Sequence, residues 1–442
     1  MKYFRAILIL LSLLLATGCG ARQDAARVYR TPEMKGELTI TVFAPSRFLE
    51  TAAALFMDKY PDVTITINNF VDQLKTVTNA ENGTVMSAVT EEYSLENYLL
   101  YMNTRIMSGQ ADDLFDMRML TTYRYEDMGV FEDLSFYIEN APEINGENFY
   151  MNIFDAMRDK GGRMFELPVF GAADTFVYFD TRLAENTGLF LDESLQTISY
   201  RDAIAYAQKL CRASTLEETY LSWDDAAKAA MRYVNDSYAT YIDLYNYEVH
   251  FDSEAFIGLL HEVQALYAEF GEGYSPTGKI AYNYESADWQ AAIYAILSPA
   301  SQSQTMPLAD ENGAVPYNCQ SYAINSKSPD KDLAWEFLRF MLTDEVQTLP
   351  SLALCGVSKV GLHAYAESVC SNARAGGGVD VPEEAFRQML NNWLLLVNAH
   401  HRRDYRIEEK LYAELIRFFS GSQTAEETAK TLQSWCNMYL NQ

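Results

Sequence analysis

A strand–helix–strand pattern over residues 37–67 constrains the fold of this chain more than any other stretch of its sequence. Apolar residues alternate with polar ones over 38–42 and again over 63–67, which predicts two strands. Between them, apolar residues recur at helical spacing as far as Pro61, and Ser46 is the predicted N-cap. Strands joined through a helix run parallel with a right-handed crossover, so the pattern predicts an α/β domain.

Length and composition predict at least two domains and argue against two classes of partner. The 442 residues exceed what a single core usually holds, and 23 Phe, 30 Tyr and 5 Trp can bury a large core. The chain has 34 Lys+Arg against 61 Asp+Glu, a formal net charge of −27. Because such a surface repels phosphates and anionic headgroups, we expect no nucleic acid partner and no polybasic contact with a membrane.

The N-terminus is predicted to be a processing signal rather than part of the fold. A positively charged start precedes an apolar stretch at 6–16, which is too short to span a bilayer. The small residues that follow, ending in Cys19, resemble the lipobox of bacterial lipoproteins, in which this cysteine is acylated. An ordinary signal peptide beside a chance cysteine is the alternative. We expect 1–18 to be removed and the polar segment 19–36 to form a flexible tether.

The remaining cysteines and histidines form no recognisable site. The five cysteines are odd in number and have no zinc-type spacing, and one bridge, Cys355 to Cys370, is left open. The pair His400-His401 precedes two arginines and is interpreted as a solvated basic patch rather than a metal site. The five are Cys211, Cys319, Cys355, Cys370 and Cys436.

No catalytic signature occurs in the sequence. The nucleophile elbow, the P-loop, the metalloprotease helix and the dinucleotide fingerprint are all missing. Paired carboxylates such as Asp112-Asp113 and Asp224-Asp225 are too common in so acidic a chain to mark an acid/base pair. The sequence therefore predicts a protein that is not an enzyme, with no cofactor and no metal.

Helical and strand patterns continue along the rest of the chain. We expect a strand that ends at Pro168, another at 176–179, and a mobile loop at 371–380 before a mainly helical C-terminus. A helix at 329–347 is expected to begin with Ser328 as its N-cap. Further helices are predicted at 91–108, 199–212 and 253–270.

Five segments together resemble a known family. They are Tyr60 to Ile65, Gly109 to Leu114, Gly129 to Leu134, Met164 to Pro168, and Ser321 to Leu338. In this order and spacing the chain resembles the family 1 extracellular solute-binding proteins, which are the maltose-binding-protein-like receptors of ABC importers. The segment 251–257 is similar to one common in Gram-positive members.

The resemblance implies a two-lobed, periplasmic-binding-protein-like α/β fold. Each lobe would hold a mainly parallel sheet flanked by helices, and the chain would cross between the lobes three times. Lobe 1 would comprise 37–168 and 324–347, and lobe 2 would comprise 175–316 and 357–442. The hinge crossings would be 168–175, 316–323 and 348–357.

The resemblance also implies a function. The protein would be lipid-anchored on the outer face of a bacterial, Gram-positive cell membrane. It would capture a small polar ligand, best a mono- or oligosaccharide, by hinge closure and deliver it to the permease subunits of an ABC importer. Two alternatives stay open: a ligand-sensing lipoprotein for a membrane kinase, and an exported glycoside-active enzyme.

Aromatic and polar residues near the predicted strand ends and crossings are the candidate ligand contacts. Aromatic faces cover the apolar side of a pyranose, while polar side chains bind its hydroxyls. Trp289 is the best stacking candidate, whereas Trp335 is assigned to packing. For each candidate, a residue without ligand contact is the alternative. The candidates are Ser46, Arg47, Asp116, Met117, Asp174, Tyr178, Tyr284, Asp288, Trp289 and Trp393.

Overall fold

The chain divides into two compact units, residues 1–32 and 33–442, and the helices and strands described here all lie in the second. The computed structural model describes residues 29–71, 75–78, 85–88, 95–120, 122–126, 128–173, 175–192, 194–213, 225–271, 278–282, 303–352, 354–377, 382–400 and 404–441.

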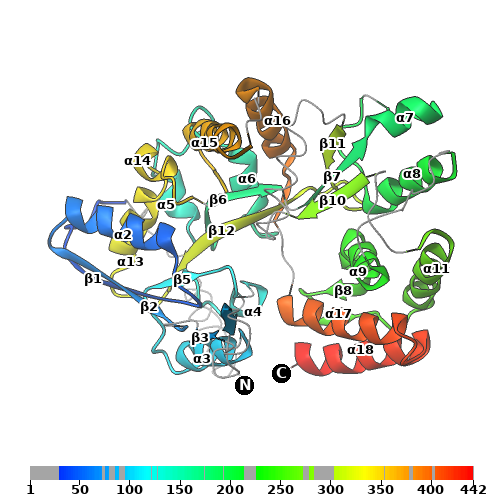
Figure 1. Ribbon diagram of the computed structural model, residues 1–442. Helices are drawn as coiled ribbons and strands as arrows, with labels where there is room; N and C mark the ends of the chain where they lie inside the picture. The colour runs from blue at the N-terminus through cyan, green and yellow to red at the C-terminus, as the bar shows by residue number, and fades with distance from the viewer. Residues whose placement is uncertain are drawn as a thin grey trace, which may run out of the picture. The chain divides into compact units, whose positions relative to one another are not determined.

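The first sheet has seven strands among the described residues, in the order β13-β6-β12-β5-β1-β2, with β14 paired to β12 (Figure 1). Its strands are β1 (Gly36–Val42), β2 (Val63–Asn69), β5 (Leu114–Asp116), β6 (Leu167–Ala173), β12 (Pro316–Ile324), β13 (Cys355–Gly356) and β14 (Ala399–His400). β1 runs parallel to β2 and to β5, as predicted, with Ile40 opposite both Ile67 and Leu114. β12 runs antiparallel to β5 and β6, so the sheet is mixed.

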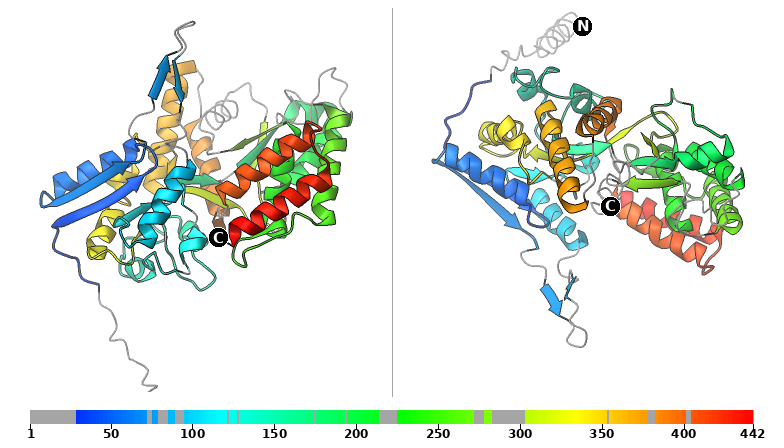
Figure 2. Two further views of the ribbon diagram at one scale, coloured as in Figure 1. Left: turned by 90° about the horizontal axis from the view of Figure 1, so that it is seen from below. Right: turned by 45° about the horizontal axis from the view of Figure 1, so that its top comes forward.

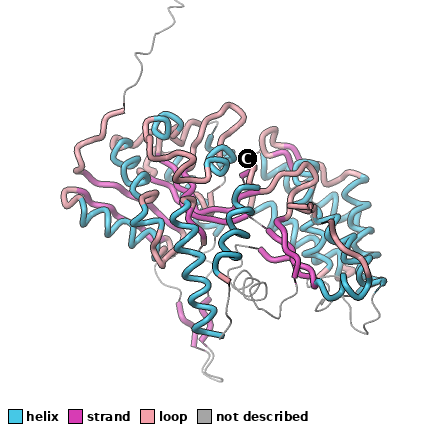
Figure 3. Tube along the Cα trace, turned by 90° about the horizontal axis from the view of Figure 1, so that it is seen from above, coloured by secondary structure: helices cyan, strands magenta, loops and turns pink. Residues whose placement is uncertain are grey.

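Helices pack along both sides of these strands (Figure 3). They are α2 (Arg47–Lys59), α3 (Leu95–Met107), α4 (Thr122–Glu126), α5 (Ser135–Glu139), α6 (Met151–Ala156), α13 (Lys331–Phe340), α14 (Asp344–Gln347), α15 (Lys359–Gly377) and α16 (Glu383–Leu396). The predicted strand–helix–strand unit is confirmed, and Ser46 Oγ accepts a hydrogen bond from the Leu49 N–H at 3.3 Å. Phe56 of α2 packs between Phe337 and Phe340 of α13.

The second sheet is antiparallel over the described residues. Its strands are β7 (Thr175–Asp180), β10 (Gly278–Tyr282) and β11 (Ser303–Pro307), and β7 pairs antiparallel with both neighbours. The expectation of a mainly parallel sheet in lobe 2 is therefore wrong for these strands. An apolar strand pattern carries no direction, because direction is set by the connections between strands.

The other elements include the helices of the second core and two short hairpins. α17 and α18 lie side by side (Figure 2). The helices are α7 (Thr181–Thr187), α8 (Tyr200–Ala213), α9 (Ala226–Asp236), α10 (Tyr238–Tyr241), α11 (Glu254–Phe270), α17 (Tyr405–Phe419) and α18 (Ala425–Leu440). The hairpin strands are β3 (Lys75–Thr78), β4 (Val85–Ala88), β8 (Ile242–Asp243) and β9 (Glu248–Val249).

Two buried clusters matter for the argument that follows. The first core gathers side chains of α3, β5 and α4, including Tyr98, Phe115 and Tyr125. The second core gathers side chains of β7, α8, α9, α11, α17 and α18, including Phe256 and Leu411. Trp335 is fully buried beside Tyr137, which confirms its assignment to packing.

The strand at Pro168 differs from its prediction. β6 begins at Leu167 and continues through the proline instead of ending there. The pairing register with β12 shifts between Gln320 and Ser321, opposite Pro168. Proline has no N–H to donate, and an irregularity in the ladder is where a strand tolerates it.

Two other local predictions are corrected, and one point that the sequence leaves open is decided. α13 begins at Lys331 with Asp330 at the N-cap position, and the Ser328 hydroxyl, which donates to Asp113 Oδ1 at 2.6 Å, accepts from the Asp330 N–H at 3.1 Å just before the helix. Residues 371–377 belong to α15 rather than to a loop, while 378–380 lie outside the described residues. Cys355 and Cys370 are both free thiols, so the bridge left open between them does not form.

The three predicted crossings include three strands that are neighbours in the first sheet. β6, β12 and β13 fall in these segments, and β6 pairs with the other two. The lobe boundaries themselves stay predictions. Over the described residues, the structure contains no helix long and apolar enough to cross a membrane.

Candidate functional site

The carboxyl ends of the parallel strands β1 and β5 form the edge where open α/β sheets place their ligands. β5 ends at Asp116 and is followed by Met117, which is buried in the first core. β1 is followed by the loop that leads to Ser46 and Arg47, at the start of α2. Four of the predicted ligand residues therefore follow the ends of two adjacent strands.

Asp116 is the best-defined polar group at this edge. Its buried carboxylate accepts hydrogen bonds from the Arg118 backbone N–H at 3.1 Å, from Nε at 3.2 Å and from Nη2 at 2.8 Å. Gln320 of β12 donates from Nε2 to the same carboxylate at 2.8 Å. The Arg118 side chain remains 37% exposed. The pair therefore joins a buried, fixed carboxylate to a guanidinium that reaches solvent.

The Arg118 guanidinium stays charged in this pair, and the Asp116 carboxylate compensates its charge. Burial opposes the charge on Arg118, but the adjacent Asp116 carboxylate outweighs it and raises the pKa of the guanidinium. Burial also raises the pKa of Tyr98 and of Tyr322, so both phenols stay protonated. Tyr322 lies directly opposite Asp116 in the sheet, and its hydroxyl has no hydrogen-bond partner among the described residues.

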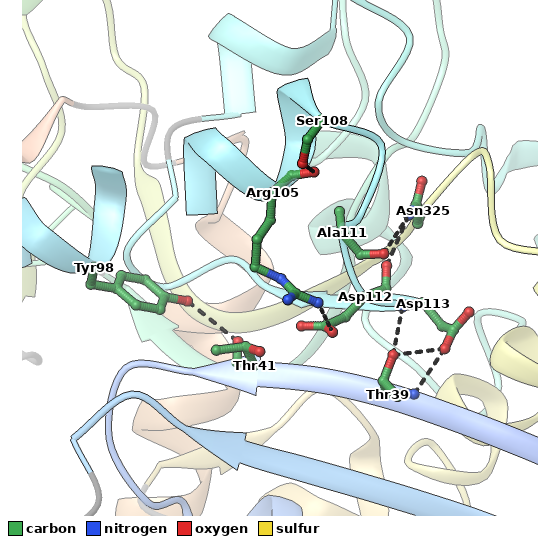
Figure 4. Close-up of polar contacts among 9 residues, drawn as sticks. All are labelled: Thr39, Thr41, Tyr98, Arg105, Ser108, Ala111, Asp112, Asp113 and Asn325. Atoms are coloured by element: carbon green, nitrogen blue, oxygen red, sulfur yellow. Dashed lines mark hydrogen bonds and ion pairs between the residues drawn. The ribbon is translucent and has the colours of Figure 1, made fainter. Parts of the chain in front are cut away.

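The opposite end of β5 is held by structural hydrogen bonds (Figure 4). Asp113 Oδ2 accepts from the Thr39 N–H and from the Thr39 hydroxyl, each at 2.9 Å. Asp112 forms an ion pair with Arg105 Nη2 at 2.8 Å, and its carbonyl accepts from Asn325 Nδ2 at 2.9 Å. These contacts tie β5 to β1, α3 and the end of β12, which holds Asp116 in place at the other end.

Three of these paired carboxylates have structural partners: Asp112, Asp113 and Asp225. Asp225 is the N-cap of α9, where its Oδ1 accepts from the Lys228 N–H at 2.7 Å. Asp224 lies outside the described residues. Over the described residues, no three His, Cys, Asp or Glu side chains are grouped closely enough to hold a metal ion.

The other ligand candidates lie in different settings. Ser46 serves as a helix cap, and Arg47 is exposed at the first position of α2. Trp393 of α16 is only 6% exposed, and its ring lies 5.0 Å from that of Phe176, which is a packing position. Tyr178 is in β7, where its backbone pairs with Lys279 and Thr305. Asp174, Tyr284, Asp288 and Trp289 lie outside the described residues, as does Cys19.

Sequence reasoning missed Arg118 and Gln320. Arg118 stands two positions after Asp116 in the turn that follows β5, a spacing that could have indicated it, because an Asp side chain commonly accepts from the backbone N–H two residues on. Gln320 is 204 residues away from Asp116 along the chain, and no local pattern connects the two.

His400 was interpreted as part of a solvated patch, and the structure corrects this. The residue belongs to β14 and pairs with Tyr317 of β12, which draws its side chain under partial cover. Its Nε2 lies 4.0 Å from Glu166 Oε2, the same oxygen that accepts a 2.6 Å hydrogen bond from the Ser321 hydroxyl. His401 lies outside the described residues.

Several solved structures share the fold. A search of curated proteins found no significant match. An ABC substrate-binding protein from Listeria monocytogenes, solved with cycloalternan, aligns with TM-score 0.53 and 14% identity over 92% of this chain and 99% of its own. The GacH receptor of Streptomyces glaucescens, solved unliganded and with acarbose, aligns with TM-score 0.53 and 14% identity over 92% of this chain and 99% of its own. The sugar-binding protein MalE from Xanthomonas citri aligns with TM-score 0.55 and 12% identity over 92% of this chain and 98% of its own.

The family itself is shown by the sequence. The model of the bacterial extracellular solute-binding proteins matches residues 44–348, which is more than half of the chain and includes β5, β6, β7 and β12. The likeness to the solved structures agrees with this in fold, including the two-lobed architecture. The chain therefore belongs to the family 1, maltose-binding-protein-like extracellular solute-binding proteins.

Proposed function

We propose that this protein is a receptor that captures a small neutral carbohydrate and delivers it to an ABC importer. The family match over residues 44–348 is the observation that carries the proposal. Two of the structural neighbours were solved with cycloalternan and with acarbose, which supports a sugar as the ligand class. A third is a sugar-binding protein by name.

The Asp116–Arg118 pair supports a neutral ligand. Because the carboxylate compensates the guanidinium charge, the exposed edge of Arg118 offers N–H donors without a net positive charge. Sugar hydroxyls accept from such donors, whereas an anionic ligand gains little from a compensated cation and meets a chain of net charge −27. Arg118, with Ser46 and Arg47, would form the lobe 1 side of the site, and the buried Asp116 and Met117 would support it.

The lobe 2 side of the proposed site comes mainly from residues outside the described ranges. Trp289, with Tyr284 and Asp288, would supply stacking and hydroxyl contacts, and Asp174 and Tyr178 would contribute from the first crossing. Trp393 is the weakest member of the set because its ring is packed against Phe176.

A thermal-shift panel tests the ligand class. The panel sets neutral malto-oligosaccharides and cyclic tetrasaccharides against uronate oligosaccharides, with chromatography of each sugar after incubation. We expect a neutral sugar to raise the melting temperature and to be recovered unchanged. Cleaved sugar would favour the glycoside-active enzyme, and a shift with uronates alone would contradict a neutral ligand.

A pair of arginine variants places the site in the same assay. Arg118→Ala should weaken binding of the active sugar by about tenfold or more, since it removes charge-assisted donors. Arg212→Ala is the matched control, because Arg212 is also exposed and paired to a carboxylate, that of Glu269, on helices α8 and α11. Equal affinity of the two variants would remove Arg118 from the site.

We also propose that Cys19 carries a lipid anchor, and this rests on the sequence of the N-terminus. Cys19→Ala should release the protein from the membrane fraction of the producing cell, while the affinity of the purified protein for its sugar stays unchanged because β1 starts at Gly36. Equal membrane retention of the variant would contradict lipid anchoring. A sensor for a membrane kinase would share these properties, and co-purification of permease subunits or of a kinase distinguishes the two roles.

A further inference from the structure

The short helix α4 contributes side chains to both cores. It follows β5 directly, and Tyr125 packs in the first core, where its hydroxyl donates to Asn103 Oδ1 of α3 at 2.7 Å. Tyr123, two positions earlier, packs in the second core. Residues i and i+2 of a helix point to opposite sides, so α4 lies at the junction of the two cores.

A single buried carboxylate receives α4 at this junction. Asp404 is fully buried and caps α17, where its Oδ1 accepts from the Arg406 and Ile407 N–H groups at 3.0 and 3.3 Å. Its Oδ2 accepts from the Tyr123 hydroxyl at 2.7 Å. The Tyr439 hydroxyl of α18 donates to the same carboxylate at 3.1 Å. Asp404 is thus bonded from α4, α17 and α18 at once.

Arg124 strengthens the same junction from its outer side. Its Nε donates to the Tyr123 hydroxyl at 3.1 Å, and its Nη2 donates to the Tyr439 carbonyl at 2.9 Å. The guanidinium also lies 4.3 Å from the centre of the Tyr439 ring. An exposed ion pair between Arg406 of α17 and Glu96 of α3 spans the two cores at 3.0 Å.

The two phenols differ in what they connect. Tyr439 and Asp404 belong to adjacent elements of the second core, whereas Tyr123 arrives from the helix that follows β5. Burial raises the pKa of Tyr123 and of Tyr439, so both hydroxyls stay protonated donors. If α4 moved away from α17, Asp404 would lose one of its donors while still largely buried, which opposes the separation.

We propose that Tyr123 and Asp404 form an interlobe lock, which holds α4 against α17 and stabilises the closed arrangement of the lobes without contacting the ligand. The proposal rests on the hinge closure in the proposed function. Closed here means the arrangement in which α4 contacts α17 and α18. The lock would set ligand affinity from outside the site, because the free energy of closure is contained in every measured dissociation constant.

Two phenylalanine variants test the lock without any ligand. Tyr123→Phe removes the hydroxyl that joins the lobes, and Tyr439→Phe removes a hydroxyl bonded to the same carboxylate from within the second core. Both keep the ring, and circular dichroism checks that both fold. Small-angle scattering of the unliganded proteins should show a larger radius of gyration for Tyr123→Phe alone. We expect about a tenfold shift of the closed-to-open ratio, equivalent to about 1.4 kcal/mol.

Two results would overturn the lock. One is an unchanged radius for Tyr123→Phe, and the other is equal expansion of Tyr439→Phe, which would assign the effect to the carboxylate's local environment. Arg124→Lys is a second variant, and it should expand the unliganded protein as Tyr123→Phe does. These measurements contain no sugar. A larger radius for Tyr123→Phe, but not for Tyr439→Phe, would therefore support the lock even if the thermal-shift panel finds no ligand.

Discussion

At the scale of single residues, burial assigns Trp393 to packing. Trp393 has its ring against Phe176 and is almost fully covered, although its neighbours Asn391 and Asn392 are polar. The Asn391 side chain is itself occupied, since its Oδ1 accepts from the Tyr150 hydroxyl at 2.8 Å. A polar sequence context therefore did not mark a surface position here.

Two alanine variants distinguish a stacking tryptophan from a packing one. Trp393→Ala should lower the free energy of unfolding by about 3 to 5 kcal/mol, because it leaves a cavity beside Phe176. Trp289→Ala should instead weaken sugar binding by about 2 kcal/mol or more while the unliganded protein melts nearly as before. Chemical denaturation and titration calorimetry measure the two effects. A large loss of unliganded stability in Trp289→Ala would assign that residue to packing.

At the scale of elements, the adjacent strands β13, β6 and β12 are packed with little spare room. Gly171 of β6 pairs with Cys319 on one side and with Cys355 on the other. A Cβ atom at this position would press on the Asn318 carbonyl oxygen and lie 2.9 Å from the Cys319 Cα. Backbone atoms cannot move aside as a flexible side chain can, so only glycine fits.

Alanine substitutions at Gly171, which is tightly surrounded, and at Gly258, which is not, should have opposite effects on stability. Gly171→Ala should destabilise the protein by about 1 to 3 kcal/mol through overpacking of the sheet. Gly258→Ala is the control, because its Cβ in α11 would meet no atom within 4 Å, and it should stabilise by about 0.5 to 1 kcal/mol. Urea unfolding at one temperature compares the two. Equal stability of Gly171→Ala and the parent protein would contradict tight packing of β6 between β12 and β13.

At the scale of the whole molecule, the proposed function requires that ligand binding and lobe closure are coupled. A ligand shifts the equilibrium only if it binds the closed form better than the open one, which requires contacts from both lobes. The proposed site would meet this condition, since Asp116 and Arg118 lie at the end of β5 and just after it, and Trp289 belongs to the segment between β10 and β11. The interlobe lock would add to closure independently of the ligand.

Closure predicts a change of size on binding. A sugar that is active in the panel should reduce the radius of gyration at saturation, measured by small-angle scattering. Micromolar affinity corresponds to about −8 kcal/mol, and the free energy of closure is already contained in that value. Sugar-free buffer and a sugar that gives no thermal shift are the controls. An unchanged radius at saturation would favour a rigid cleft or a site on one lobe.

The sequence alone determined the local elements near the start of the fold. The strands around Leu38 and Ile65, the helix between them and its Ser46 cap all follow from patterns a few residues long, because propensity, periodicity and capping act over one or two turns. The family followed from the order of such segments. Local patterns did not predict the direction of β7 relative to β10 and β11. They also did not predict the passage of β6 through Pro168.

Only the tertiary structure decided which polar groups meet. Gln320 reaches Asp116 across 204 residues, and Tyr123 reaches Asp404 across 281. His400 is partly covered because β14 pairs with β12, although two arginines follow at positions 402 and 403. Such contacts depend on how sheets and helices are stacked, and that is set by the burial of apolar surface over the whole chain. A local sequence pattern predicts a residue's own conformation, but it holds no information about a partner brought close by folding.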